Sequence, residues 1–386
     1  APQANQAKDP ALPDAYVRGL QSLLGEDQLR AIDAFTELAR KEPDSLDLHL
    51  ALGHLFRRKG ETDRAIRVHQ NLLTRSDLRP EIQANLQREL ALDYIKAGLY
   101  DRADQSLQAL IGSPLELEAQ RLRLDLAQRV RDWPLALTLS EGLSNSNADQ
   151  AAAAAADRSI VGNREALAHL QAHLQVEMAH QLTGQARYEE AFEVLRKAQL
   201  IAPDHPRAWI EECLLFIQLS DATNADASAQ RLLTRWPEHA ARIAAAWLKL
   251  IDDAESSDRL LKTRRFELLT IAFRKIAAYD VLQPLVDHLD AQHGPDTARG
   301  FLDVEPHASI GLLSVLLRLK RRNIIEQHEE ALLGTITRII EPLAQQTSRY
   351  ICRHCSFQAN RHYWQCPGCH QWDGYPAQRA DEVAAS

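Results

Sequence analysis

The chain has 386 residues, of which 45% are hydrophobic and 25% charged, a composition typical of water-soluble globular proteins with room for two or more units. A formal net charge of −8 argues against electrostatic binding to nucleic acid or to an anionic membrane. Five cysteines in this length exclude a disulfide-stapled secreted domain. The sequence also has no signal peptide and no apolar run of about 18 residues.

The chain begins with APQANQAKDP, without an initiator methionine. This beginning suggests that an upstream segment has been removed. We therefore expect residues 1–12 to be a disordered segment that follows a missing membrane anchor, and the rest to be soluble without that anchor.

A 34-residue period runs through the sequence that follows. Gly19 and Gly53 are 34 residues apart, as are Ala31 and Ala65, and YVRGLQSLLGEDQLRAIDAFTEL resembles LALGHLFRRKGETDRAIRVHQNL. The same small-residue signature returns at three later alanines, Ala103, Ala136 and Ala191. A period of this length with Gly, aromatic, Ala and Pro residues at these offsets resembles the tetratricopeptide repeat, which implies stacked pairs of helices.

Helical periodicity supports this interpretation. One helix face carries Ala65, His69, Leu72 and Leu73 at i, i+4, i+7 and i+8, with Ile66 beside them. Gly53 and Ala65 are small where two helices must approach closely, and Gly60 can end the first helix at positive φ. Because neither helix can bury its apolar face alone, neighbouring pairs must stack. An unrelated helix bundle is the alternative, but it would not need a fixed period.

We therefore predict an all-α fold, a tetratricopeptide-repeat solenoid, before a small C-terminal domain. Repeats 1–4 are expected at residues 13–143, and further, partly degenerate repeats at residues 165–345. Ala136 and Ala191 are 55 residues apart, one repeat plus 21. The excess falls on an Ala-rich insert at residues 144–164, which we expect to be a loop or an extended helix.

Two CxxC pairs stand near the end of the chain, and they consist of Cys352, Cys355, Cys366 and Cys369. Such pairs make tight turns whose backbone amides face the sulfur atoms, and four thiolates suit a tetrahedral zinc or iron ion. Residues 350–376 have too few apolar residues for a core, so we expect one bound metal ion, zinc in preference to iron, to stabilise them. Residues 377–386 are expected to be a disordered tail.

Three alternatives remain for the cysteines: two disulfides, a thioredoxin-like redox pair and a nucleic-acid-binding ribbon. A chain with few thiols disfavours the first, and the lack of a βαβ pattern disfavours the second. The near-neutral charge of this segment disfavours the third. The neighbouring histidines are surplus as ligands and are expected on the surface: His354, His362 and His370.

Other candidate sites have simple interpretations. His169 and His173 lie four residues apart, a spacing that can chelate a metal, but we expect them on a solvated helix face. The basic run 318–323 is expected at a solvated helix end, and Cys213 is expected to be buried. Because the sequence has no phosphate loop, nucleophile elbow or catalytic triad, we predict that the protein is not an enzyme.

The knuckles CRHCSF and CPGC resemble those of rubredoxins, which carry iron and transfer electrons. Tetratricopeptide repeats followed directly by such a module resemble the LapB (YciM) family of lipopolysaccharide assembly proteins from Gram-negative bacteria. The resemblance is carried by LHLALGHLFRRKGETDRAIRVHQNLL, YIKAGLYDRADQSLQALI and the tail with YWQCPGC. It implies that the four cysteines are metal ligands. It also implies that an N-terminal transmembrane helix, absent from this chain, holds the repeats on the cytoplasmic side of the inner membrane.

The same resemblance implies a function as a non-catalytic adaptor. Such proteins restrain lipopolysaccharide synthesis by promoting proteolysis of the deacetylase LpxC by the membrane protease FtsH, and the regulator PbgA/YejM opposes them. The first helix of each repeat is expected to line a concave groove, where His54 and Arg57 are candidate partner-binding residues. We expect the metal unit to dock on the C-terminal end of the repeats, over the last helix, and leave homo-oligomerisation open.

Two other functions remain open. A rubredoxin-like iron centre could transfer electrons to a partner held by the repeats. The repeats could also serve as a generic scaffold or co-chaperone for another client.

Overall fold

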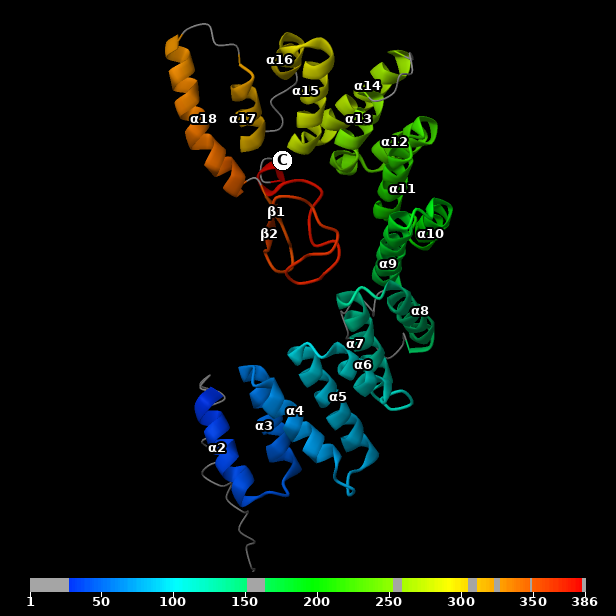
Figure 1. The fold of residues 1–386 in the computed structure, drawn as a ribbon, viewed down its shortest axis with the longest axis vertical. Helices are drawn as coiled ribbons and strands as arrows, with labels where there is room; N and C mark the ends of the chain where they lie inside the picture. Colours follow the sequence, from blue (N-terminus) through cyan, green and yellow to red (C-terminus); the bar gives the residue numbers. More distant parts are fainter. Residues whose placement is uncertain are drawn as a thin grey trace, which may run out of the picture. The chain divides into compact units, whose positions relative to one another are not determined.

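The computed structural model describes residues 28–150, 164–252, 259–304, 311–322, 327–347 and 349–383, which are mostly α-helical (Figure 1). The chain divides into two compact units, residues 1–162 and 163–386. Within the described ranges, β-strands occur only after Arg349. The predicted fold class is confirmed: stacked helix pairs precede a small C-terminal domain with the cysteine knuckles. Residues 1–12 lie outside the described ranges.

In the first unit, successive helices pack against each other from α2 to α8. The helices form pairs of the tetratricopeptide type, α3 with α4, α5 with α6 and α7 with α8, and α2 precedes them. Their bounds are α2 Gln28–Lys41, α3 Leu46–Lys59, α4 Thr62–Leu73, α5 Pro80–Ala97, α6 Tyr100–Gln108, α7 Glu116–Arg129 and α8 Trp133–Gln150. Helix α8 thus continues into the first residues of the predicted insert, and residues 151–163 lie outside the described ranges.

The second unit continues this architecture from α9 to α18 and then adds a small domain. Helix α9 pairs with α10, α11 with α12, α15 with α16 and α17 with α18. The bounds are α9 Arg164–Gly184, α10 Tyr188–Ile201, α11 Arg207–Gln218, α12 Ala222–Arg235, the 3₁₀ helix η2 Pro237–Arg242, α13 Ala244–Asp252, α14 Arg259–Ile276, α15 Tyr279–His293, α16 Pro295–Val304, α17 Leu312–Lys320 and α18 Gln327–Thr347.

A single turn geometry joins the two helices of successive pairs in both units. Each turn contains one residue in the left-handed region, at positions Gly60, Gly98, Arg131, Ala186 and Ser220. A fully buried alanine follows each of them five residues later, at Ala65, Ala103, Ala136, Ala191 and Ala225. The predicted role of Gly60 is confirmed, since it caps α3 with a φ of 88°. The turn and the alanine together define each repeat.

Gly53 is required by the close approach of α3 and α4. A Cβ atom at Gly53 would lie 2.3 Å from Nε2 of His69, which is fully buried. His69 cannot move aside, because its Nδ1 contacts a carboxylate oxygen of Asp93 on α5 at 2.5 Å. The predicted need for a small residue at position 53 is therefore confirmed, and the contacting side chain is His69.

The C-terminal domain contains two short strands and one short helix. Strand β1 (Tyr350–Ile351) pairs antiparallel with β2 (Gln358–Ala359), in the register Tyr350↔Ala359. The predicted disordered tail is wrong for residues 377–383: helix α19 (Ala380–Val383) forms there, and the carboxylate of Glu382 accepts a hydrogen bond of 2.6 Å from the backbone N–H of Tyr279. That contact ties the tail to the N-terminus of α15.

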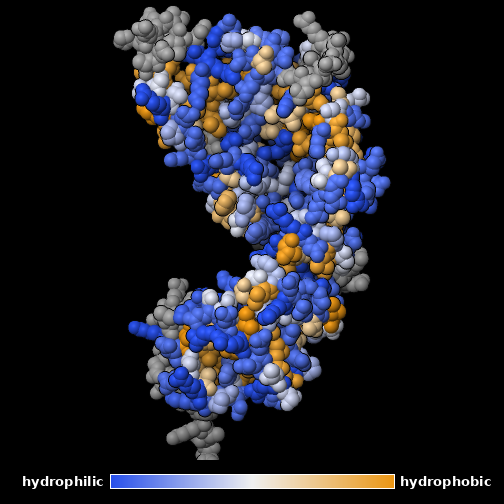
Figure 2. Space-filling view, in the orientation of Figure 1, coloured by the Kyte–Doolittle hydropathy of each residue, from blue (hydrophilic) through white to orange (hydrophobic). Residues whose placement is uncertain are grey.

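Hydrophilic residues cover most of the face shown in Figure 2, and hydrophobic residues form separate patches on it. Among the described residues, the most exposed large apolar side chains are Leu200 and Val304, at 82% and 79%. None of the described helices is both long and apolar enough to cross a membrane.

Candidate metal centre and the surface that holds it

The two knuckles have the same backbone geometry. In the first, the N–H of Cys352 donates to the carbonyl of Phe357, and the N–H of Ser356 donates to the carbonyl of Cys352. In the second, Cys366 bonds in the same way with Gln371 and His370. The fifth residue of each knuckle, Ser356 or His370, has a φ near 60°. This repeated turn places the two cysteines of each pair at the same end of their hairpin.

The four thiols converge. Their sulfur atoms all lie within 4.8 Å of one another. The Sγ atoms of Cys352 and Cys369 are 3.8 Å apart, and those of Cys355 and Cys366 are 3.6 Å apart. A tetrahedral zinc ion with Zn–S bonds of about 2.3 Å would place its ligands about 3.8 Å apart. The sulfur positions therefore fit one four-coordinate metal ion, and they are too far apart for the alternative of two disulfides.

Glycines leave space for the sulfur cluster. A Cβ atom at Gly374 would lie 2.8 Å from the Sγ of Cys352, and one at Gly368 would lie 3.0 Å from the ring of Phe357. Any side chain at position 374 would therefore displace a candidate ligand. The space around the thiols is shaped by the backbone as well as by the cysteines.

One thiol is disposed to ionise. Burial raises the pKa of Cys366, but hydrogen bonds from the backbone N–H groups of Cys369 and Gly368 outweigh burial, and the pKa falls to about 6. The Gly368 N–H lies 3.4 Å from this sulfur. Because metals bind the thiolate form, this environment favours metal binding near neutral pH.

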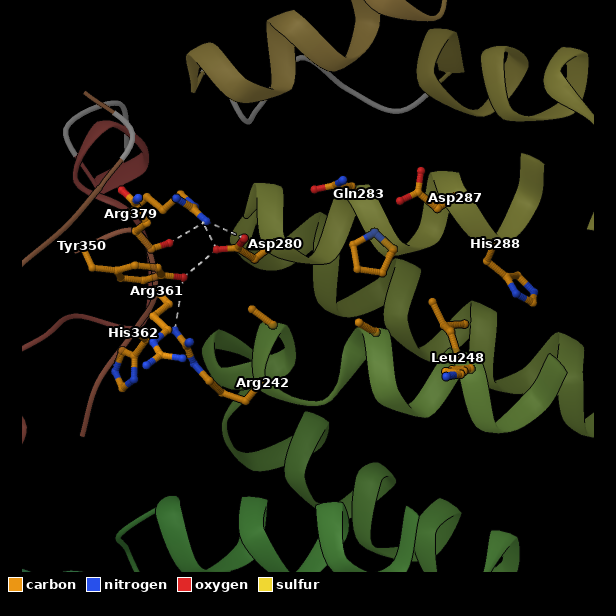
Figure 3. Close-up of a pocket in the computed structure, with 15 residues that line it drawn as sticks. Arg242, Leu248, Asp280, Gln283, Asp287, His288, Tyr350, Arg361, His362 and Arg379 are labelled. Atoms are coloured by element: carbon orange, nitrogen blue, oxygen red, sulfur yellow. Dashed lines mark hydrogen bonds and ion pairs between the residues drawn. The ribbon is translucent and has the colours of Figure 1, made fainter. Parts of the chain in front are cut away.

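One set of contacts fixes the knuckle domain to η2 and α15. The Tyr350 hydroxyl donates to the Asp280 carboxylate at 2.6 Å, and Arg379 donates to both oxygens of the same carboxylate at 2.9 and 2.8 Å (Figure 3). Arg242 Nη2 donates to the Tyr350 hydroxyl at 3.3 Å and to the carbonyl of Ala377 at 2.9 Å. The side chains of these four residues, Arg242, Asp280, Tyr350 and Arg379, border a cavity of about 580 Å³. The Asp280 carboxylate thus accepts hydrogen bonds from both the first strand of the domain, at Tyr350, and its C-terminal segment, at Arg379.

A second set of contacts fixes the other side of the domain to α9 and α11. The His173 imidazole stacks on Trp372, and its Nε2 lies 2.9 Å from an Asp373 oxygen. Arg207 donates to Nδ1 of His173 at 3.0 Å, and its guanidinium lies 5.1 Å from the Trp372 ring. His205 Nε2 lies 3.3 Å from Asp373. This set joins an Arg, a His and an Asp in one chain of hydrogen bonds.

The hydrogen bonds determine the protonation of His173. A guanidinium can only donate, so Nδ1 is an acceptor, and Nε2 carries the proton that it donates to Asp373. Burial and then the charge of Arg207 lower the pKa of His173 to about 3, although Asp373 opposes them. Desolvation raises the pKa of Asp373, but the hydrogen bond from His173 and the nearby imidazole of His205 hold it well below its usual range. The neutral imidazole of His173 therefore lies between the Arg207 cation and the Asp373 anion.

The structure corrects several expectations about this region. His173 is fully buried, so the predicted solvated face is wrong for it, because this face of α9 is covered by the knuckle domain. His362 is partly buried against Trp364, although His354 and His370 are exposed as predicted. The basic run lies at the C-terminal end of α17 with Lys320 and Arg322 exposed, as predicted, and Arg321 pairs there with Asp287 and Asp290. Cys213 is fully buried, as predicted.

The position of the domain also differs from the expectation. Its contacts within the described ranges include α9, the turn before α11, η2 and α15, together with the end of α14 and the start of α17. The domain thus docks along several helices of the second unit instead of over the last helix alone. Figure 1 shows it inside the curve that the helices of the second unit describe. Residues one repeat apart make contacts with the domain: His173 and Arg207 are separated by 34 residues, as are His205 and His239, whose ring stacks on Trp364. That spacing is the sequence signal that could have revealed this surface.

The predicted partner-binding residues belong to an ion cluster in the first unit. His54 Nε2 lies 2.9 Å from an oxygen of the buried Glu89, and Arg57 donates to Glu89 at 2.6 Å and to Asp93 at 2.9 Å. Burial raises the pKa of Glu89, but hydrogen bonds from His54, Arg88 and Arg57 outweigh it and lower the pKa. The cluster joins α3 to α5, and His54 remains 48% exposed.

Comparison with known proteins agrees with this architecture. Residues 350–374 match a family model described as a rubredoxin metal binding domain. The chain is 26% identical over 376 residues to lipopolysaccharide assembly protein B of Escherichia coli strain K12, which covers 96% of this chain and 91% of that protein. It is 24% identical to the protein of the same name from Haemophilus influenzae strain Rd, over 93% of this chain and 88% of that protein.

A solved tetratricopeptide repeat protein from Parabacteroides merdae aligns with 71% of this chain and 97% of its own, at 16% identity and a TM-score of 0.34. The family resemblance rests on the sequence relatives, which cover nearly the whole chain, and on the separate match of the knuckle segment. The chain is a homologue of lipopolysaccharide assembly protein B, with tetratricopeptide-type helix pairs and a C-terminal rubredoxin metal binding domain.

Proposed function

We propose that this protein is a non-catalytic adaptor in lipopolysaccharide assembly. The observation that carries the proposal is the similarity to lipopolysaccharide assembly protein B across both the helical repeats and the knuckle domain. As in the family that it resembles, the adaptor would act on the cytoplasmic side of the bacterial inner membrane. There it would promote proteolysis of LpxC by FtsH, and PbgA/YejM would oppose it.

We propose further that Cys352, Cys355, Cys366 and Cys369 bind one metal ion, zinc in preference to iron. The sulfur separations and the clearance at Gly374 support this assignment. A bound ion would replace a hydrophobic core in the knuckle domain, which has few buried residues of its own. Its role is therefore structural: it keeps Tyr350, Trp372 and Asp373 in position to contact the repeats.

Protein recognition would use the surface of the helix pairs. In the first unit, His54 is the better candidate of the two predicted contact residues, because its ring is half exposed. Arg57 is only 21% exposed, and its guanidinium already bonds to two buried carboxylates. Removing Arg57 would take one cation away from both carboxylates, and the resulting loss of stability would obscure any effect on binding.

Co-purification from a Gram-negative lysate tests the function. The wild-type chain is expected to retain LpxC and FtsH, as detected by mass spectrometry. His54→Ala is expected to reduce capture, whereas His49→Ala on the same helix, whose Nδ1 bonds locally to the Ser45 carbonyl, is the matched control. Capture of neither LpxC nor FtsH by the wild-type chain would overturn the proposed function. Equal capture by the His54 variant would overturn only the assignment of that residue.

A further inference from the structure

A second group of potential metal ligands lies where the knuckle domain meets the repeats. One nitrogen from each of His169 and His205 and one oxygen from Asp373 lie within 4.8 Å of one another. The three residues come from separate elements: His169 from α9, His205 from the turn before α11, and Asp373 from the end of the second knuckle. None of them belongs to the sulfur cluster.

The distances suit a shared ion better than a hydrogen bond. His205 Nε2 lies 3.3 and 3.4 Å from the two Asp373 oxygens. A charge-assisted N–H···O bond is shorter, about 2.7–2.9 Å. Two ligands of one tetrahedral zinc ion, each bonded at about 2.0–2.1 Å, lie about 3.4 Å apart. His205 is also buried, with an exposed fraction of 4%, and its Nδ1 has no hydrogen-bond partner among the described residues.

The neighbouring His173 cannot serve as a ligand in this arrangement. Its Nδ1 accepts from Arg207, and its Nε2 donates to Asp373, so neither nitrogen has a free lone pair. The pair of histidines four residues apart on α9 therefore does not chelate. Instead, the ring of His169 faces His205, with 4.9 Å between centroids. His173 fixes Asp373, which is the kind of outer contact that orients a ligating carboxylate.

The protonation states agree with metal binding. Burial and then the neighbouring His205 lower the pKa of His169, whereas the carboxylates of Asp373, Glu165 and Asp204 oppose the shift. A neutral imidazole is the form that binds a metal. The same carboxylates give the site a negative environment that favours a divalent cation. Two imidazoles and one carboxylate are ligands typical of zinc, and they leave a fourth position for water.

We propose that His169, His205 and Asp373 form a second site for a divalent transition metal, of the zinc type, which links the knuckle domain to the repeats. The ion would bind α9, the turn before α11 and the second knuckle simultaneously. It would strengthen the docking that His173 and Trp372 already provide. This site is separate from the adaptor function and does not depend on it.

The test is the zinc stoichiometry of the full chain. The protein is first loaded at its cysteine site, freed of excess metal and then titrated with zinc ions by isothermal calorimetry, with elemental analysis after gel filtration. The wild-type chain is expected to bind one further ion, for two in all. His169→Gln is expected to weaken the second binding event at least about tenfold and to leave the first unchanged.

The control variant is His180→Gln on the same helix, since His180 is exposed and pairs with Glu211. This variant is expected to bind two ions like the wild type. Cobalt provides a second readout, because an ion bound by nitrogen and oxygen adds ligand-field bands but no sulfur-to-metal charge-transfer band. A wild-type stoichiometry of one, unchanged binding in His169→Gln, or an equal loss in His180→Gln would overturn the proposal.

Discussion

The imidazole of His173 stacks on the indole of Trp372, with 4.4 Å between ring centroids and 18° between ring planes. The first residue lies in the middle of α9, and the second ends a metal knuckle. Because both rings are more than nine-tenths buried, the contact behaves as part of a core. The knuckle domain is thus stabilised by the helices around it.

Replacing Trp372 with alanine should destabilise the second unit. The change removes a large buried side chain and exposes His173, and comparable truncations cost about 3–5 kcal/mol. Denaturant unfolding followed by circular dichroism measures the effect on the helices. His370→Ala, at an exposed position in the same knuckle, should change the midpoint little.

Deletion of residues 350–386 should also lower the melting temperature of the helices, and an unchanged value would contradict docking.

Acid should weaken the structure through His239. Burial and then the charges of Arg242 and His205 lower its pKa to about 4, although Asp373 opposes them. In the unfolded chain, the imidazole binds a proton at a higher pH, near 6.5. The contribution of neutral His239 to the free energy of unfolding is therefore complete above pH 6.5 and is lost as the pH falls towards 4. At pH 5 the loss is about 1–2 kcal/mol.

The measurement compares the free energies of unfolding of the wild-type chain and His239→Gln at pH 7.5 and pH 5. Taking the difference between variants at each pH cancels any release of metal from the cysteines. The difference should change by about 1–2 kcal/mol between the two pH values. A constant difference would show that His239 does not titrate in this range.

Gly53→Ala should destabilise the first unit by about 2 kcal/mol or more, since the new methyl group would overlap the buried His69 ring. Gly142→Ala is the matched comparison, because no described atom lies within 4 Å of its new Cβ. In a helix interior that change should be neutral or stabilise by up to about 1 kcal/mol. Thermal melting distinguishes the two, and equal shifts would refute the close contact at Gly53.

The metal content tests the cysteine site. The purified protein should hold zinc at the four thiols and be colourless, and Cys366→Ser should lose that ion and unfold the knuckle domain. Cys213→Ala, which removes the buried thiol in the repeats, should keep it. A coloured protein that bleaches on reduction would identify iron and would instead support electron transfer.

Local patterns predicted the repeats and the knuckles, because a fixed period and a CxxC spacing each reflect contacts close in sequence. The docking surface depends on residues such as His173 and Trp372, which meet only after the chain has folded back on itself. A spacing of four residues indicated that His169 and His173 share a face, but it could not show what covers that face. The predicted free tail failed for a similar reason, since Glu382 is ordered by a distant helix end.

The left-handed turn lies five residues before a buried alanine in repeat after repeat, whereas the interval from one such alanine to the next ranges from 33 to 55 residues. The differences in repeat length therefore fall between helix pairs, and the distance from the turn to the buried alanine within each pair stays constant. A chain organised in this way can gain or lose residues in the loops between helix pairs without altering the turns within each pair. Those loops are therefore suitable positions at which protein engineers could insert reporter domains.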